Sequence, residues 1–403
     1  MKNKTLGSTL IVAGTTIGGG MLAMPLTSAG MGFGMTVLLL FLLWILLCFS
    51  ALLFVEVYQT ASHKDGIASL AEKYFGGVGR LISTLSLLIF MYAILSFYVT
   101  SGGPLISGLL PSVEGWDMTL VGVLLFTFIL GGFVVIGTGS VDVVNRIFFF
   151  TKIAVFILVL ALMLPLVKTQ NLLEVPVSNA LILSAAPVFF TAFGFHVVIP
   201  SIVDYLDGDI KRLRIAIIVG TGIPLIAYLL WQLATHGVLN QTRFLEIIKV
   251  DPSLNGLVNA TLELTGSKVL SEAVRIFSAL ALITSFLGVS LALFDCLRDL
   301  LGRVNLQANR VSLGILTFIP PLAFALFYPQ GFYVALGYAG IMFAFYGLVL
   351  PIGLAWKARR QYPKLNYRVM GGSAALILAL VVGILIIAIP FLIQAGYLPA
   401  VVG

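Results

Sequence analysis

Apolar residues fall into long runs along this chain, and short polar stretches separate the runs; the longest polar stretch is residues 237–271. Eleven runs are long enough to span a bilayer core of roughly 30 Å as helices. They cover residues 6–29, 35–58, 81–109, 119–138, 146–167, 180–204, 213–236, 272–299, 311–328, 332–356 and 373–396. The pattern predicts an all-α polytopic membrane protein with eleven transmembrane helices.

Glycine interrupts the first apolar run at its middle. Residues 14–20 contain Gly14, Gly18, Gly19 and Gly20, and each glycine in a helix interior costs about 1 kcal/mol. One interpretation is an intact helix that uses Gly14 and Gly18 as a packing face. The other is a broken helix, whose unwound backbone survives at membrane depth only beside protein or a water-filled cavity. Because a broken helix directs partial charges at a ligand, this stretch is a candidate binding site.

The sixth apolar run carries a second interruption at a matching position. Gly194 precedes Pro200 by six residues, and Gly18 precedes Pro25 by seven residues in the first run. Since five spans separate their starts, the two runs cross the membrane in opposite directions. This arrangement predicts a five-plus-five inverted repeat with its site at the repeat interface. The single transmembrane domain, residues 1–403, then divides into repeat one at about 6–167, repeat two at about 180–356 and an extra helix at about 373–396.

Composition and charge exclude several other classes of protein. The chain is 60% hydrophobic and 10% charged, with a net charge of +7, and soluble domains do not have this composition. With the N-terminus placed inside, the inner loops carry seventeen lysines and arginines, and the outer loops carry four. This asymmetry predicts a cytoplasmic N-terminus and an external C-terminus, and it accounts for the basic excess without a nucleic-acid partner. Cys48 and Cys296 lie in apolar runs and support neither a disulfide framework nor a metal site.

Backbone groups at the two interruptions are candidate ligands for a zwitterion of amino-acid size, because half-helix ends attract an anion at one end and a cation at the other. Tyr92 and Tyr98 lie midway along the third span, where a hydroxyl could contact a substrate carboxylate. Phenylalanines at the second interruption could line a pocket for an aromatic substrate, or they could be ordinary core or lipid-facing residues. The candidate substrate-binding residues are Gly14, Thr15, Thr16, Ile17, Gly18, Gly19, Tyr92, Phe190, Thr191, Phe193, Gly194 and Phe195.

Ionisable groups at membrane depth are costly and mark functional sites by default. Lys152 falls about two turns into the fifth span. A desolvated lysine can release its proton, so Lys152 is a candidate proton carrier; the alternative is snorkelling to the inner interface. His196 lies in the second interruption and either titrates near neutral pH or serves as a neutral hydrogen-bonded group. Thr284 and Ser285 lie mid-span in the eighth run, where hydroxyls form a small cation site or bond to their own helix.

Several stretches of the chain form a recognisable set of motifs, namely residues 4–7, GTTIG at 14–18, MLAMP at 21–25, FTAFGFH at 190–196, PSIV at 200–203, TSFLGV at 284–289 and PPLAFALFYP at 320–329. With these motifs the chain resembles the aromatic amino acid permease family, within the amino acid–polyamine–organocation superfamily. The likeness covers essentially the whole chain and is dense at both interruptions. It implies eleven helices around a five-plus-five core with broken first and sixth helices.

The resemblance also implies a function. It implies proton-driven symport of an aromatic amino acid across the bacterial inner membrane, with a periplasmic C-terminus and no cofactor. Tyrosine is the expected substrate, and a tryptophan permease, a broad aromatic permease or an amino acid exchanger is the alternative. A channel is a further alternative, and a membrane enzyme is not, because the sequence has no His-Glu-x-x-His motif and no nucleophile with a base partner.

The family likeness gives Lys152 a specific expected place. In sodium-coupled relatives a cation lies between the first, fifth and eighth helices, and in some proton-coupled relatives a lysine of the fifth helix takes its place. The resemblance therefore implies that Lys152 lies near the carbonyls of Ala13 and Gly14 and the hydroxyl of Ser285.

Overall fold

The computed structural model of the chain describes residues 4–108, 110–111, 114–303, 305–306, 308–329 and 331–401. Within these ranges only the backbone is described at residues 138–140, 142, 303, 332 and 333. Every regular element in the described ranges is a helix, which confirms the predicted all-α class. The predicted end of the third span, at residue 109, lies outside the described residues.

The helices follow one another along the chain with short connections. In order they are α1 (Lys4–Thr16), α2 (Gly20–Ser28), α3 (Gly32–Tyr58), α4 (Ile67–Ser107), α5 (Met118–Ile136), α6 (Thr138–Met163), α7 (Thr169–Leu172), α8 (Leu181–Ala192), α9 (Ile199–Tyr205), α10 (Ile210–Val238), α11 (Gln241–Val250), α12 (Leu254–Thr265), α13 (Lys268–Arg303), α14 (Arg310–Phe327), α15 (Phe332–Ala344), α16 (Leu350–Gln361) and α17 (Gly372–Gln394).

The first span is broken. Helices α1 and α2 form a bent pair with an angle of 49° between them. The amide of Ile17 donates the last helical bond of α1, to the Ala13 carbonyl at 2.9 Å, and helix resumes only at Gly20. In the described part of the chain, ten helical segments can cross a membrane, and the bent pair makes an eleventh. The broken helix is therefore confirmed, and the intact packing helix is wrong.

The sixth span is broken at the predicted place. Helix α8 ends at Ala192, a short 3-10 turn covers His196–Val198, and α9 begins at Ile199. Pro200 lies in the first turn of α9, where a missing amide costs no helical bond. Breaks in the first and sixth spans confirm the predicted fold class, and the division into two repeats stays a prediction.

Two spans differ from the hydropathy pattern in detail. Helix α4 begins at Ile67 rather than near residue 81, and Gly76 inside it adopts φ 69°, so the helix is kinked there. The tenth span contains a π-helical turn, Phe345–Val349, between α15 and α16. Such turns are typical of functional positions in helices, and nothing in the sequence indicated this one.

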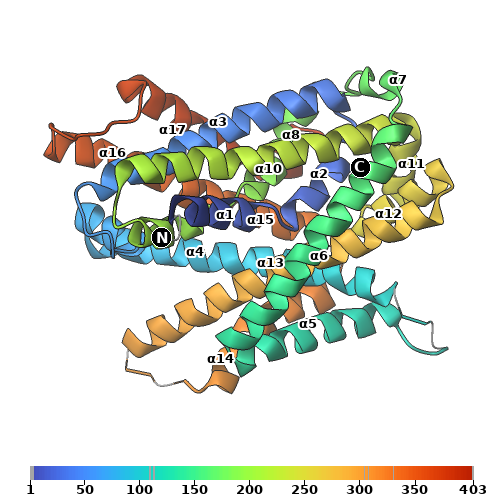
Figure 1. The fold of residues 1–403 in the computed structure, drawn as a ribbon, viewed down its shortest axis with the longest axis horizontal. Coiled ribbons are helices and arrows are strands. Elements are labelled where there is room, and N and C mark those ends of the chain that lie inside the picture. The colour runs from blue at the N-terminus through green and yellow to red at the C-terminus, as the bar shows by residue number, and fades with distance from the viewer. Residues whose placement is uncertain are drawn as a thin grey trace.

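Most spans run roughly along the long axis of the molecule, α6 crosses them obliquely, and the N-terminus lies toward one end (Figure 1). We call that end the N-terminal face and the opposite end the distal face. Helix α10 packs against α1 and α3, whereas α4, α5, α13 and α14 all contact one another. Helix α6 packs mainly on α13. The first span packs on α10 through α1, and on the sixth span through α2 and α8.

The polar stretch at 237–271 forms two short helices, α11 and α12. Each begins at a capping residue, because the Asn240 side chain accepts from the Arg243 amide at 3.2 Å and the Ser253 hydroxyl accepts from the Asn255 amide at 3.1 Å. Helix α12 packs on α2, α4 and α13. Helix α12 therefore covers the distal ends of these three helices.

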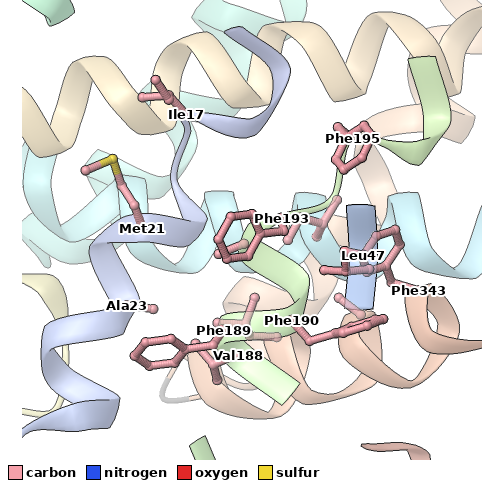
Figure 2. Close-up of a cluster of buried hydrophobic side chains, with 14 of the residues drawn as sticks. Ile17, Met21, Ala23, Leu47, Val188, Phe189, Phe190, Phe193, Phe195 and Phe343 are labelled. Carbon is pink, nitrogen blue, oxygen red and sulfur yellow. The ribbon is translucent and has the colours of Figure 1, made fainter. Parts of the chain in front are cut away.

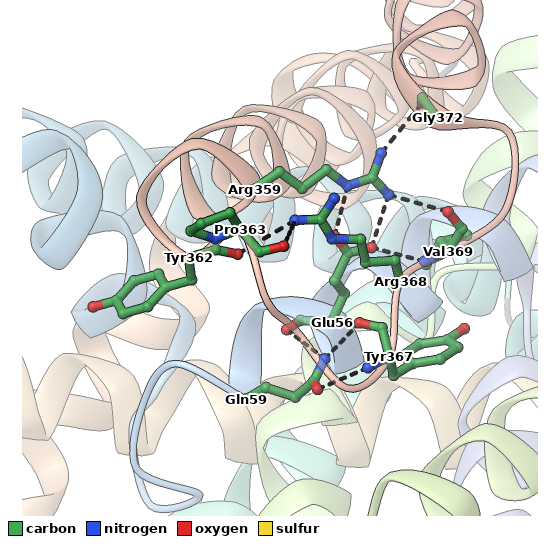
Figure 3. A network of polar contacts seen from close by, with 9 residues as sticks. All are labelled: Glu56, Gln59, Arg359, Tyr362, Pro363, Tyr367, Arg368, Val369 and Gly372. Atoms are coloured by element: carbon green, nitrogen blue, oxygen red, sulfur yellow. Dashed lines mark hydrogen bonds and ion pairs between the residues drawn. The ribbon is translucent and has the colours of Figure 1, made fainter.

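A buried ion pair joins two spans at the N-terminal face (Figure 3). Glu56, near the end of α3, is fully buried. Its oxygens accept from Arg359 Nε at 2.6 Å and from Arg359 Nη2 at 2.8 Å. The Val369 amide donates to the same carboxylate at 2.8 Å. A buried carboxylate needs such paired donors, and here they fasten the loop after α16 onto α3.

Candidate functional site

Lys152 reaches the first break from α6. Its side chain is 1% exposed, and Nζ donates to the Ile17 carbonyl at 2.9 Å and to Thr284 Oγ1 at 3.1 Å. Nζ also lies 5.0 Å from the centroid of the Phe149 ring, within cation–π distance. The lysine therefore does not snorkel to the interface. It links the break in the first span to α6 and α13.

The backbone acceptor of Lys152 differs from the expected one. The Ala13 carbonyl accepts the last bond of α1, from the Ile17 amide at 2.9 Å. The helix thus continues about one turn further than expected before it breaks. As a result Lys152 bonds to the carbonyl of Ile17, and not to those of Ala13 and Gly14.

The Ser285 hydroxyl holds another part of the same break. It accepts from the Gly19 amide at 3.0 Å, so it is not the acceptor of the lysine, and Thr284 has that place instead. This close approach requires glycine. A Cβ atom on Gly18 would overlap Ser285 Oγ, and one on Gly19 would lie 2.8 Å from the Tyr98 ring.

Phenylalanines at the second break belong to the buried core (Figure 2). Phe190, Phe193 and Phe195 are each fully buried. The Phe190 ring packs on Phe343 of α15 with centroids 4.9 Å apart, and the Phe193 ring packs on Tyr228 of α10 at 5.0 Å. None of the three predicted phenylalanines is among the residues that line the cavity at the two breaks. The second break presents backbone and small side chains to that cavity, and not aromatic rings.

Two predicted polar candidates also face away from the cavity. The Tyr92 hydroxyl donates to the Leu316 carbonyl of α14 at 2.8 Å. His196 is fully buried, and its ring centroid lies 6.3 Å from that of Phe54 and 5.3 Å from that of Phe343. Neither Tyr92 nor His196 lines the cavity. Both side chains are committed to contacts between helices.

The cavity at the two breaks has a volume of about 630 Å³, which is typical of small-molecule sites. Nine of the predicted site residues line it, namely Gly14, Thr15, Thr16, Gly18, Thr191, Gly194, Lys152, Thr284 and Ser285. Two more, Ile17 and Gly19, bond to lining side chains through their backbone. The structure therefore brings together both breaks, the lysine and the two hydroxyls of α13.

The cavity extends from the breaks toward the N-terminal face. Its wall includes Leu10 and Ile11 from the middle of α1, Asn145 from the first third of α6, and Cys296 from the last third of α13. Leu10 and Ile11 are 57% and 41% exposed. On the distal side of the break, by contrast, Met21 and its neighbours in α2 are fully buried.

Helix α4 supplies an apolar wall to the same cavity. Phe90, Met91 and Ile94 line it, with Tyr98 one turn further along. This wall, and not the phenylalanines of the second break, is the apolar surface available to a ring in the cavity. Hydropathy alone cannot find such a wall, because every face of a buried membrane helix is apolar.

One polar residue at the breaks was absent from the sequence prediction. Tyr228 of α10 is fully buried, and its hydroxyl lies 2.6 Å from the Thr16 carbonyl and 2.8 Å from the Ala192 carbonyl. The available signal was a tyrosine at the middle of the seventh span. The same signal drew attention to Tyr92 and Tyr98 in the third span.

Comparison with known proteins identifies the family. The model of the tryptophan/tyrosine permease family matches residues 1–390. The chain belongs to this family. The permease is 61% identical over 402 residues to tyrosine-specific transport system 1 of Haemophilus influenzae, and 58% identical over 406 residues to system 2 of the same organism. Each match covers 100% of both chains. The permease is thus a membrane transport protein and not an enzyme.

A solved structure supports the fold of the permease. The manganese transporter of Eremococcus coleocola superposes with a TM-score of 0.63, over 97% of this chain and 86% of that chain. The two sequences are 14% identical, so the likeness concerns the fold alone.

Proposed function

We propose that this permease is a proton-coupled symporter that imports L-tyrosine across the bacterial inner membrane by alternating access. The observation that carries the proposal is the bonding of Lys152 Nζ to both the Ile17 carbonyl and the Thr284 hydroxyl. This contact places a titratable group directly on the broken helix. The choice of L-tyrosine is supported by the two tyrosine-specific relatives, which match over their whole length.

The breaks supply polar groups for the amino acid part of the substrate. Helix α1 ends at Thr16, so the helix provides no amide donor for the carbonyls of its last residues, Gly14, Thr15 and Thr16. These carbonyls carry the negative end of the helix dipole and suit an ammonium group. Helix α2 starts at Gly20, directly after Gly18 and Gly19, which lie beside Ser285 and Tyr98. The Gly20 backbone lines the cavity, and an amide at this helix start suits a carboxylate.

The aromatic ring of the substrate then lies along α4. Phe90, Met91 and Ile94 provide an apolar wall beside the breaks. Burial of an aromatic ring on such a wall contributes on the order of 2–3 kcal/mol. This placement leaves the buried rings of the second break as support for the backbone, and not as contacts of the substrate.

Proton coupling follows from the change in Lys152 when it gains or loses its proton. A protonated amine donates charge-assisted hydrogen bonds to both acceptors, Ile17 O and Thr284 Oγ1. A neutral amine still has two N–H donors, but without the charge its bonds are weaker. A buried ammonium among neutral oxygens is costly, which favours release of the proton to the inner side. The weaker bonds of the neutral amine then loosen the first break from α6 and α13. The two states of the carrier then differ in proton affinity, which is what coupling requires.

The direction of the cavity fits the proposed orientation. With the N-terminus in the cytoplasm, as the loop charges predict, the cavity would open to the inside. In that orientation the described conformation would be the one that releases substrate and proton. The outward-facing conformation would require α1 and α9 to close over the N-terminal face and α2 and α8 to open on the distal face.

The experiment is uptake of labelled L-tyrosine by the purified permease in lipid vesicles. We expect accumulation when the vesicle interior is alkaline, and none with a sodium gradient at equal pH. Unlabelled L-tryptophan and L-phenylalanine should compete less well than unlabelled L-tyrosine. Accumulation without a pH gradient would contradict proton coupling, and equal competition by all three amino acids would identify a broad aromatic permease instead.

A further inference from the structure

The Tyr228 hydroxyl lies where the two broken helices meet. It is within hydrogen-bond distance of the Thr16 carbonyl, at 2.6 Å, and of the Ala192 carbonyl, at 2.8 Å. These carbonyls belong to the last residues of α1 and α8. The phenol ring comes from α10 and is held by the Phe193 ring, with centroids 5.0 Å apart. One side chain of a third helix therefore joins the ends of both half-helices.

Three oxygens meet at this point, the Tyr228 hydroxyl and the carbonyls of Thr16 and Ala192, and they share one donor proton. A tyrosine hydroxyl has one proton and can donate to only one of the two carbonyls at a time. The nearest threonines do not help, because Thr16 Oγ1 donates to the Val12 carbonyl at 2.7 Å and Thr191 Oγ1 donates to the Pro187 carbonyl at 2.7 Å. A buried carbonyl without a donor costs about 1–3 kcal/mol. The Tyr228 hydroxyl proton therefore lowers the free-energy cost of burying these carbonyls, because it is a donor for one of them.

The same junction faces the cavity. Thr16 and Ala192 both line it, whereas Tyr228 is fully buried behind them. A substrate ammonium in the cavity has three N–H donors and accepts nothing. It can therefore supply the donors that the junction lacks. When the carrier holds no substrate, the hydroxyl is the donor that remains for the two carbonyls.

We propose that Tyr228 is a positioning residue that takes the place of the substrate ammonium during the return of the empty carrier. Its proton keeps the ends of α1 and α8 together while both half-helices pass through the closed state without substrate. The loaded carrier does not depend on it, because the ammonium satisfies the same carbonyls. This inference rests on the proposed transport of an amino acid, and it assigns to Tyr228 one step of that cycle.

The test compares two modes of transport in vesicles loaded with labelled L-tyrosine at equal pH on both sides. Efflux into buffer without substrate requires the empty carrier to return, whereas exchange against saturating external L-tyrosine does not. For Tyr228→Phe we expect efflux to fall about tenfold and exchange to stay within about twofold of wild type. Phenylalanine keeps the ring on Phe193 and removes only the hydroxyl.

Tyr58→Phe is the matched control. Tyr58 is also buried, and its hydroxyl also donates to a backbone carbonyl, that of Asp65 at 2.7 Å. It lies at the end of α3, outside the cavity lining. We expect efflux and exchange by this variant to match wild type. A selective loss of efflux in Tyr58→Phe as well would overturn the assignment, since the effect would then belong to any buried hydroxyl.

Other outcomes also decide the matter. Equal loss of efflux and exchange in Tyr228→Phe, or loss of neither, overturns the proposal.

If Tyr228→Phe is not recovered from the membrane, Phe193→Leu is measured in the same way, because this change removes the ring that holds the phenol. Selective loss of efflux in that variant supports the proposal, and an equal loss overturns it. The result is separate from proton coupling, because Tyr228→Phe should still respond to a pH gradient, and failure of coupling would abolish that response.

Discussion

The two breaks occupy corresponding spans of the fold but differ in what holds them. The first break is held by polar groups from other helices, namely Lys152 of α6 and Ser285 of α13. The second break shares the Tyr228 hydroxyl of α10 with the first break. Otherwise it is held by its own backbone turns, in which the Phe193 amide donates to the Phe190 carbonyl at 3.2 Å and the Gly194 amide donates to the Thr191 carbonyl at 3.0 Å. Fully buried phenylalanines pack around it.

The two breaks therefore have different roles at the cavity. Polar contacts that depend on a proton can be made and broken at low cost, so the first break suits movement. A break enclosed by aromatic rings in a dense core resists local deformation, so the second break would keep its local shape while its half-helices move with the rings packed on them. The two breaks touch, because a Cβ atom on Gly20 would lie 2.9 Å from the Ala192 Cα atom. We therefore expect changes at the first break to affect coupling and binding, and changes at the second to affect stability.

The largest effect is expected from a side chain at the first break. Gly18→Leu should abolish binding of labelled L-tyrosine to the purified permease, since its Cβ atom would overlap Ser285 Oγ. Gly132→Leu is the control, because that glycine of α5 has open space around its Cβ position. Both variants should insert into the membrane. Undiminished binding by Gly18→Leu would mean that the substrate does not approach this backbone.

A change at the second break should act on stability. Phe190→Ala removes a fully buried ring packed on Phe343, and loss of such a ring costs about 3–5 kcal/mol. We expect a lower temperature of thermal inactivation in detergent, with the order of competition among L-tyrosine, L-tryptophan and L-phenylalanine unchanged. Ile94→Ala, on the α4 wall of the cavity, should change that order instead. A changed order in Phe190→Ala at unaltered stability would place the substrate ring at the second break.

The smallest effect is expected from an exposed ion pair that holds the start of α1 at the N-terminal face. Lys4 Nζ lies 2.7 Å from an Asp207 oxygen, and this hydrogen bond and charge hold the pKa of Asp207 below its ordinary value. A lowered pKa means that the pair is intact at neutral pH and is lost only as pH falls through the lowered value. Asp207→Asn should therefore leave the pH dependence of uptake unchanged between about pH 6 and pH 8. A shifted profile would show that this exposed pair takes part in coupling.

Hydropathy and turn residues were enough to predict the spans and both breaks. Four glycines within residues 14–20, and Gly194 followed by Pro200, mark backbone that cannot remain regular helix at modest cost. Lys152 was recognisable because a charge at membrane depth is rare. These features depend on residue type alone, which is why a single sequence reveals them.

The details of contact could not be predicted, because they depend on rotation and register. Whether the helix broke at Ala13 or at Ile17 determined which carbonyl met Lys152, and these positions differ by about one turn. The phenylalanines of the second break point into the core because of how α8 is rotated against α15 and α10, which an apolar sequence does not record. Tyr228 lies in another span, so only the packed structure shows that it meets both breaks.

The most direct test of the central claim is accumulation driven by a pH gradient in vesicles that contain Lys152→Ala. Without the amine, the Ile17 carbonyl and the Thr284 hydroxyl lose the donor that links α1 to α6 and α13. We expect this variant to exchange internal for external L-tyrosine but not to concentrate it, and we expect Lys152→Arg, with its permanent charge, to transport in neither mode. If Lys152→Ala still concentrates L-tyrosine in response to the pH gradient, Lys152 is not the coupling group and the proposed mechanism of coupling is wrong.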